Sequence, residues 1–165
     1  MSTERPLYPG DVATAVDLLR LADEYHRAAV LLATLGRRGQ PISRAPYRFA
    51  AIHALELYLS ALLIHLGHMP STVRGLQHDL AARADRALGG GLSLRKRTDA
   101  HLRAMAAVRE YQVSRYDPQV GATLSQVNRL AATLEEVATK ARAIIRGDQK
   151  STCVAGKARA DRATG

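Results

Sequence analysis

The sequence contains no tryptophan and only one phenylalanine, and aromatic residues make up 4% of its 165 residues. Runs of β-branched and aromatic residues bounded by turn residues, which are typical of strands, are missing throughout. Alanine, leucine and arginine dominate instead, so the predicted fold class is all-α. Hydrophobic residues account for 47% of the chain. Because a chain of this length can bury roughly 70% of its unfolded surface around one core, we expect a single folded domain.

Cysteine is almost absent, because Cys153 is the one cysteine in the chain. This count excludes an internal disulfide framework and a cysteine-based zinc site. A ferritin-like metal site needs Glu-x-x-His on each of two helices, whereas His53 and Glu56 occur once and in the reverse order. We therefore expect no metal and no cofactor.

Residues 1–10 lack the apolar core of a signal peptide, so we expect a flexible N-terminus and a cytoplasmic location.

Apolar residues recur at steps of three and four in five segments, which is the pattern of amphipathic helices. The predicted helices span about residues 11–36, 43–66, 76–88, 93–116 and 123–145, with the start of the fourth at either Ser93 or Thr98. Short loops join these segments. The sequence therefore predicts an up-and-down antiparallel bundle of four to five helices over residues 11–146.

The second predicted helix is apolar on nearly every side. Such a helix is either the centre of a bundle or a membrane span. A glutamate in the middle of a membrane span is costly, so Glu56 favours the bundle core, and no membrane association is expected. A buried Glu56 needs a partner, for which an arginine from another helix is the first expectation. A ligand-binding or active-site role for Glu56 and His53 stays open.

The last predicted helix carries two apolar rows. Thr123 followed by Gln126 forms a capping-box pattern at its start. The second row repeats every seven residues at Leu130, Val137 and Ile144. One row for the core and one for a partner helix would suit a homodimer, which we expect on this ground. Residues 147–165 show no periodicity and are predicted to form a disordered basic tail.

Positive charge is in excess and unevenly distributed. Lys and Arg number 24 against 15 Asp and Glu, a formal charge of +9 that favours anionic partners such as RNA or nucleotides. Residues 95–115 carry six basic and two acidic side chains, whereas residues 11–36 carry two basic and four acidic ones. The candidates for nucleic-acid binding are Lys96, Arg103, Arg109 and Arg115. An ordinary solvated helix surface is the alternative interpretation of this segment.

Three strings in a fixed order, AIHALELYLSALLIHLGHMP, GLQHDLAARA and REYQVSRYDP, are similar to the HEPN family of small helical-bundle proteins. The resemblance covers roughly residues 11–146. It implies a dimeric bundle and, for many members, a bacterial ribonuclease of toxin–antitoxin, abortive-infection or CRISPR systems. It also implies a nucleotidyltransferase-type antitoxin as a possible cognate partner. The structural or ligand-pocket candidates in and beside these strings are Glu56, His53, His78, Asp79 and Tyr116.

The resemblance further implies a catalytic motif. Active members use an arginine followed by a histidine after four to six intervening residues, and two copies meet across the dimer. Arg95 and His101, with five residues between them, match this spacing, and Arg97 would share a helix face with His101. His101 could serve as general base or acid in metal-independent RNA cleavage, with an arginine stabilising the phosphorane charge. The competing hypothesis is a non-catalytic module that binds a partner protein or small ligand.

Overall fold

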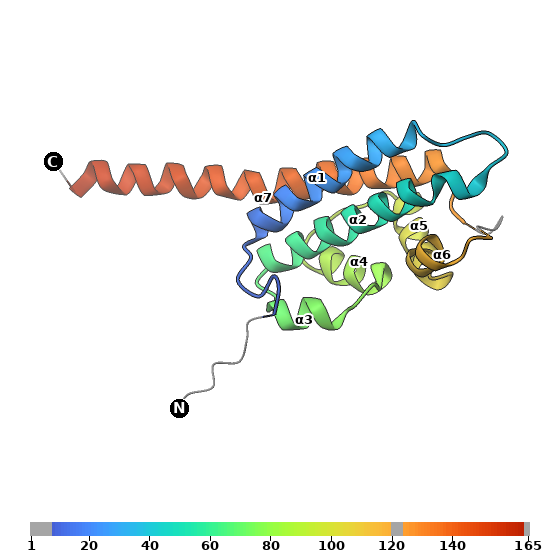
Figure 1. The fold of residues 1–165 in the computed structure, drawn as a ribbon. Helices are drawn as coiled ribbons and strands as arrows, with labels where there is room; N and C mark the ends of the chain where they lie inside the picture. Colours follow the sequence, from blue (N-terminus) through green and yellow to red (C-terminus); the bar gives the residue numbers. More distant parts are fainter. Residues whose placement is uncertain (1–7, 120–123, 164–165) are drawn as a thin grey trace, which may run out of the picture.

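A computed structural model describes residues 8–119 and 124–163, and it describes side chains as far as residue 147. These residues form seven α-helices, one short 3-10 helix and no strand (Figure 1). The helices are α1 (Ala15–Ala33), η1 (Pro41–Arg44), α2 (Ala45–His65), α3 (Pro70–Gly75), α4 (Leu80–Gly89), α5 (Lys96–Ala107), α6 (Glu110–Tyr116) and α7 (Val127–Ala163). The all-α prediction is confirmed, whereas the count of four to five helices is not.

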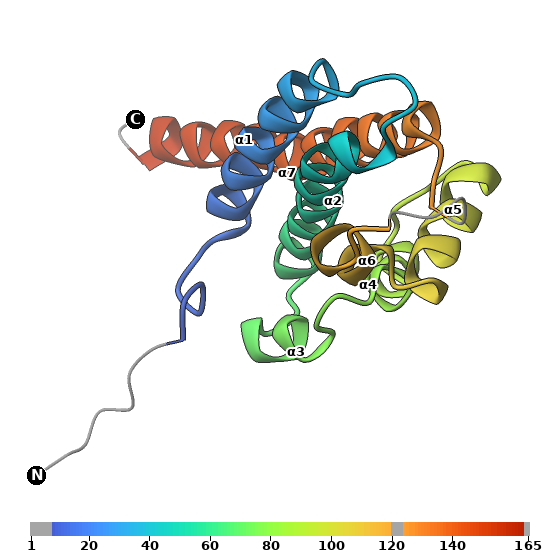
Figure 2. The same cartoon turned by 45° about the vertical axis from the view of Figure 1, so that its right-hand side comes forward.

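Helix α2 forms the centre of the bundle. It packs against α1 and α7 on one side and against α4 and α6 on the other (Figure 2). The segment Pro41–His65 has the length and apolar composition of a membrane span, but 78% of its most apolar window is buried inside the bundle. The interpretation of this helix as the core of the bundle is confirmed by that burial.

The long helices differ in direction. Tyr47 near the start of α2 donates a hydrogen bond to the carbonyl of Val127 at the start of α7, at 3.2 Å. Further along both helices, Arg142 donates to the hydroxyl of Tyr58 at 2.7 Å, so α2 and α7 run in the same direction. Helix α1 runs opposite to both (Figure 1). The predicted antiparallel arrangement therefore holds for α1 and α2, but not for α2 and α7. Four short helices, α3 to α6, lie between α2 and α7 in the chain and bring it back to the end of the bundle where α2 begins.

Two segments differ from the sequence-based prediction. The single helix predicted up to residue 116 is divided into α5 and α6, because Arg109 adopts a left-handed backbone conformation with φ of 49°. Neither Val108 nor Arg109 is a glycine or proline, so nothing in the local sequence signals this break. The predicted loop at residues 67–75 contains the short helix α3, which begins at Pro70, where a missing N–H costs nothing.

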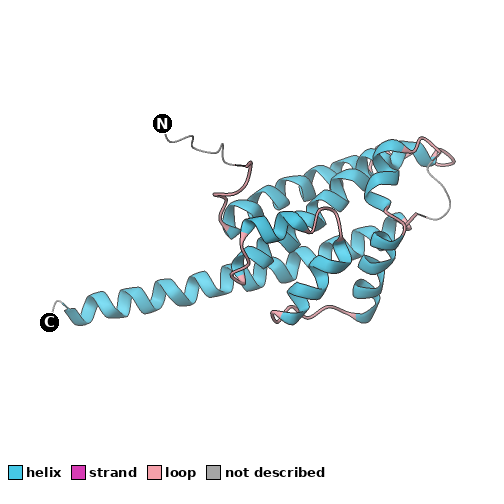
Figure 3. Cartoon of the chain, turned by 90° about the horizontal axis from the view of Figure 1, so that it is seen from below, coloured by secondary structure: helices cyan, strands magenta, loops and turns pink. Residues whose placement is uncertain are grey.

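Helix α7 begins at Val127, and its predicted start at Thr123 lies outside the described residues, as do residues 1–7 of the N-terminus. Leu130 and Val137 of the second apolar row are both 0% exposed. Ile144, the third member, is partly buried against the same core, so the bundle covers most of this row and leaves little of it for the expected partner helix. The C-terminal part of α7 projects past the other helices (Figure 3), and the disorder expected for residues 147–165 stays a prediction.

Candidate functional site

The three strings that carry the family resemblance meet at one place in the fold. A carboxylate oxygen of Glu56 on α2 lies 3.0 Å from Nδ1 of His78, in the loop before α4. The His78 ring stacks on Tyr111 of α6, with ring centroids 3.5 Å apart and an interplanar angle of 18°. The guanidinium of Arg115 lies 3.9 Å from the centroid of the Tyr111 ring. Segments that are distant in sequence thus form one cluster of titratable and aromatic side chains.

Glu56 is 5% exposed, which confirms the prediction that it is buried and paired. Its partners are histidines and not the expected arginine, because His53 Nδ1 also lies 3.5 Å from the second carboxylate oxygen. The buried guanidinium of Arg83 nevertheless interacts electrostatically with the Glu56 carboxylate. Burial lowers the pKa of Arg83, and the Glu56 carboxylate opposes that change. The Nη1 atom of Arg83 has no hydrogen-bond partner among the described residues.

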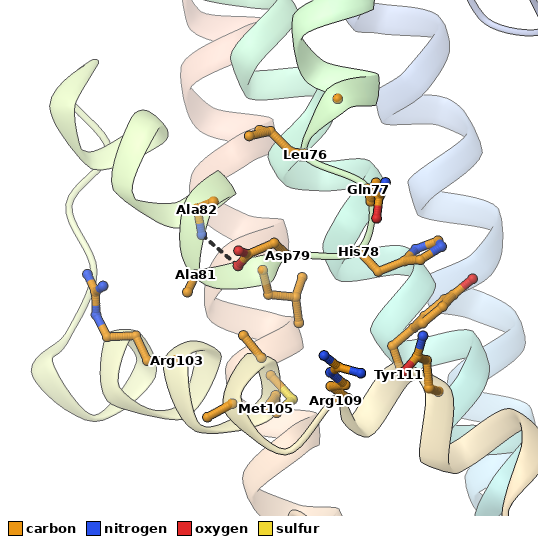
Figure 4. Close-up of a pocket in the computed structure, with 15 residues that line it drawn as sticks. Leu76, Gln77, His78, Asp79, Ala81, Ala82, Arg103, Met105, Arg109 and Tyr111 are labelled. Atoms are coloured by element: carbon orange, nitrogen blue, oxygen red, sulfur yellow. Dashed lines mark hydrogen bonds between the residues drawn. The ribbon is translucent and has the colours of Figure 1, made fainter.

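A cavity of about 900 Å³ lies beside His78 and Tyr111 (Figure 4). The loop before α4, the first turn of α4, the end of α5 and the start of α6 form its walls. Gln77 and Arg109 both line it, and they are the only non-glycine residues with positive φ in the part of the chain that the structure describes. Strained backbone of this kind clusters at functional sites. We name this space the His78 cavity.

Two of the predicted nucleic-acid-binding arginines line the His78 cavity but differ in availability. Arg103 lies on the rim far from His78 (Figure 4) and pairs with Asp85 at 2.6 Å and with Asp99 at 3.0 Å. Hydrogen bonds to Asp85 and Asp99 raise the pKa of Arg103. Arg109 is exposed and forms no ion pair within the described residues. Arg109 is therefore the cation that the cavity offers to a ligand.

Three further candidates have different placements. Asp79 accepts a hydrogen bond from the backbone N–H of Ala82 at 2.9 Å (Figure 4), so it is the N-cap of α4. Tyr116 is 77% exposed at the end of α6 and does not line the cavity. Arg115 covers the Phe49 ring at 4.3 Å as well as Tyr111. Among the described residues, no three His, Cys, Asp or Glu side chains gather as a metal site.

His101 lies in a separate cluster that joins α2, α5, α6 and α7. Its Nε2 atom is 2.6 Å from the hydroxyl of Ser125, and its Nδ1 atom is 2.7 Å from the hydroxyl of Thr133. The Ser125 hydroxyl also bonds to the carboxylate of Glu110, which is 1% exposed. Arg48 donates to the other oxygen of Glu110 at 2.8 Å. This chain of hydrogen bonds is buried at its Arg48 end and half-buried at His101.

The hydrogen bonds require a proton on Nε2 of His101. The carboxylate of Glu110, ionised beside Arg48, can only accept, so the Ser125 hydroxyl donates to it and accepts from Nε2–H. The Nδ1 lone pair then accepts from the hydroxyl of Thr133. Burial and the nearby Arg129 charge lower the pKa of His101, which favours the neutral ring. Both ring nitrogens are therefore occupied within the protein.

The basic residues at the start of α5 do not complete a site with His101. Arg95, Lys96 and Arg97 are all exposed. Arg95 is the N-cap residue of α5, and its backbone N–H donates to Glu136 at 2.8 Å. Arg97 lies four residues before His101 on the same helix, but no described contact joins their side chains. Within one chain, the structure does not bring either arginine against the imidazole.

No family model matches the chain, and no curated protein or solved structure matches it significantly. The site assignment therefore rests on geometry. Sequence reasoning missed Tyr111 and Arg83 as site residues, although both lie inside the strings that carry the resemblance. It also missed Arg48, whose only signal is an arginine in the first turn of an otherwise apolar helix.

Proposed function

We propose that this protein is a HEPN-like helical-bundle protein that binds RNA or a nucleotide in the His78 cavity. The observation that carries the proposal is the gathering of the Glu56–His78 pair, the Tyr111 ring and Arg109 around one cavity. The Tyr111 ring supports the exposed His78 imidazole, whose opposite face offers a stacking surface for a base, and a free guanidinium binds phosphate. The net charge of +9 favours the approach of such an anion.

We also propose that this site cleaves RNA without a metal ion, with His78 as the proton-transfer residue. Glu56 accepts a hydrogen bond from Nδ1–H of His78, which leaves the Nε2 lone pair without a partner among the described residues. Nε2 takes the proton of a ribose 2′-hydroxyl while that oxygen attacks phosphorus. The bond to the 5′-oxygen breaks, and this oxygen takes a proton from water. The products are a 2′,3′-cyclic phosphate and a 5′-hydroxyl, and Arg109 stabilises the negative charge on the phosphorane.

Binding is tested by fluorescence polarisation with a labelled single-stranded RNA at two salt concentrations. Arg109→Ala is expected to raise Kd by about 10-fold, because a charge-assisted hydrogen bond to phosphate is lost. Arg27→Ala removes the same charge from the exposed surface of α1 and is expected to change Kd by less than about 2-fold. Equal losses in the two variants would show non-specific attraction to a basic protein and would contradict the site.

Cleavage is tested with the same RNA in EDTA, for the wild type and Glu56→Gln. Glu56 acts as a positioning residue, so its replacement is expected to lower kcat by about 10-fold or more while KM changes little. RNA that the wild type leaves uncut, or an unchanged kcat in Glu56→Gln, would contradict this part of the proposal.

The second candidate function is a non-catalytic module that binds a partner protein or a small ligand. It is favoured by the occupied nitrogens of His101, because the arginine–histidine motif of active members is not assembled within one chain. RNA that is bound but never cut would identify this function. The homodimer and the nucleotidyltransferase-type antitoxin that the resemblance implies are further proposals. Light scattering at micromolar concentration tests the first, and a monomer mass would contradict it.

A further inference from the structure

A second cavity, of about 660 Å³, lies where the connection between α1 and α2 meets the start of α7. We name it the arginine cavity, because four arginines line it and no acidic side chain does among the described residues. The four are Arg37, Arg38, Arg44 and Arg48. It shares no lining residue with the His78 cavity.

Local hydrogen bonds and close packing hold this connection in place. The backbone N–H of Arg37 donates to Ser43 Oγ at 2.7 Å, and Arg37 Nε donates to the side chain of Gln40 at 2.7 Å. The Ser43 hydroxyl in turn donates to the carbonyl of Gln40 at 2.7 Å. Arg44 packs directly over Gly36, where an added Cβ would lie 2.8 Å from the arginine Nη1. These contacts hold the side chains of Arg37 and Arg44 in defined positions.

Most of this positive charge is not neutralised by the protein. Arg37, Arg38 and Arg44 form no ion pair with any described carboxylate, whereas Arg27 and Arg103 on other surfaces each do. Bringing like charges together is unfavourable unless a counter-charge joins them. An anion that enters the cavity would relieve this repulsion.

Arg48 adds an observation that points to a ligand. The side chain of Arg48 is 9% exposed, its Nη1 pairs with Glu110, and its Nε has no hydrogen-bond partner among the described residues. Buried donors are nearly always satisfied, and Arg48 itself lines the cavity, so an acceptor bound beside this residue would satisfy the unpaired donor. The start of α7 adjoins the same cavity through Val127 and Asn128, and the helix dipole at this end favours an anion.

We propose that the arginine cavity binds phosphate groups and is a site separate from the His78 cavity. Guanidinium groups bind phosphate oxygens in pairs, and several arginines in one cavity of this size suit two or more linked phosphates. A nucleotide polyphosphate and the backbone of RNA both present this chemistry. Glu110, which pairs with Arg48, directly follows Arg109 and precedes Tyr111 of the His78 cavity, so the buried ion pair connects the two sites.

The test is isothermal titration of the full chain with inorganic tripolyphosphate at low salt. The wild type is expected to bind, and Arg44→Ala is expected to lose at least about 10-fold in affinity. Gly36→Ala keeps every charge but places a methyl group where Arg44 lies, so it should weaken binding several-fold. Gly89→Ala is the matched control, because no atom lies within 4 Å of its added Cβ, and its affinity should equal that of the wild type.

Variants of the two cavities separate this proposal from the proposed function. Arg109→Ala should leave tripolyphosphate affinity unchanged, since Arg109 lines only the His78 cavity. Competition then identifies the phosphate source: displacement of labelled RNA by tripolyphosphate assigns the cavity to RNA, and binding without displacement assigns it to a free nucleotide. The proposal is overturned if the wild type shows no binding at millimolar tripolyphosphate, or if Arg44→Ala binds as tightly as Gly89→Ala.

Discussion

His78 and His101 each belong to a cluster that contains a buried glutamate, but they differ in what they leave for a ligand. The side chain of His78 is 49% exposed, and only its Nδ1 atom has a protein partner, Glu56, among the described residues. His101 has both ring nitrogens bonded, to Ser125 and to Thr133. A histidine needs an available nitrogen to move a proton. The direct contact of His78 with Glu56 therefore suits chemistry, whereas the link from His101 to Glu110 through Ser125 suits stability.

The largest expected effect is on the cluster around His101. Glu110→Gln leaves the charge of Arg48 unpaired in the core, so the free energy of unfolding should fall by about 3–5 kcal/mol. Glu24→Gln breaks an exposed pair on α1, where the glutamate side chain is 65% exposed, and should produce no comparable change. Urea unfolding followed by circular dichroism measures both. Equal decreases in the free energy of unfolding would show that the buried Arg48–Glu110 pair stabilises the protein no more than an exposed ion pair does.

A smaller loss is expected from His101 itself. His101→Ala removes the partner of two hydroxyl groups and should lower the free energy of unfolding by about 1–3 kcal/mol. His68→Ala is the matched control, because its side chain forms no described hydrogen bond, and it should cost less than about 0.5 kcal/mol. The same urea titrations apply. If His101→Ala were as stable as the wild type, its hydrogen bonds would not be structural.

Acidification should destabilise the fold through two buried histidines, His26 and His101. Burial lowers the pKa of both His26 and His101 below the ordinary value of 6.5. Below about pH 6.5 the unfolded chain therefore binds more protons than the folded one, and stability falls as the pH decreases. Tm should decrease from pH 7.5 to pH 5.5, with a shallower decrease in His101→Ala. A Tm that rises on acidification over this range would contradict the buried neutral histidines.

The prediction with the smallest expected effect concerns the tautomer of His101. The hydrogen bonds place its proton on Nε2 at pH 7.5, with Nδ1 as the acceptor. Long-range proton–nitrogen NMR correlations distinguish the two tautomers of an imidazole. A proton on Nδ1 would reverse the direction of the hydrogen bonds inferred here.

Helix positions in this protein could be predicted from the sequence where the signal is local. The apolar spacing that predicts a helix over residues 43–66 corresponds to η1 and α2, which span Pro41–Arg44 and Ala45–His65. The break at Arg109 could not be predicted, because it depends on burying Met105 of α5 and Tyr111 of α6 in one core, and no glycine or proline marks it. The direction of α7 relative to α2 likewise depends on packing between distant segments.

The site residues show a similar division. Glu56 and His78 could be predicted from the sequence as candidate site residues, but the contact between them depends on the fold. The sequence predicts Arg103 as a nucleic-acid-binding residue, yet it forms an ion pair with Asp85, eighteen residues earlier in the chain. The hydroxyl groups that occupy His101 come from α7 and the residues just before it, at least 24 positions away. Sequence spacing alone has no information about such partners.

The most direct test of the account compares His78→Ala with His101→Ala in one RNA cleavage assay in EDTA. Circular dichroism at low temperature first confirms that both variants are folded, and Arg109→Ala serves as a second variant of the His78 cavity. We predict that His78→Ala loses cleavage by about 100-fold or more and that His101→Ala stays within a few-fold of the wild type. Cleavage abolished in folded His101→Ala but retained in His78→Ala would contradict the assignment of function to the His78 cavity.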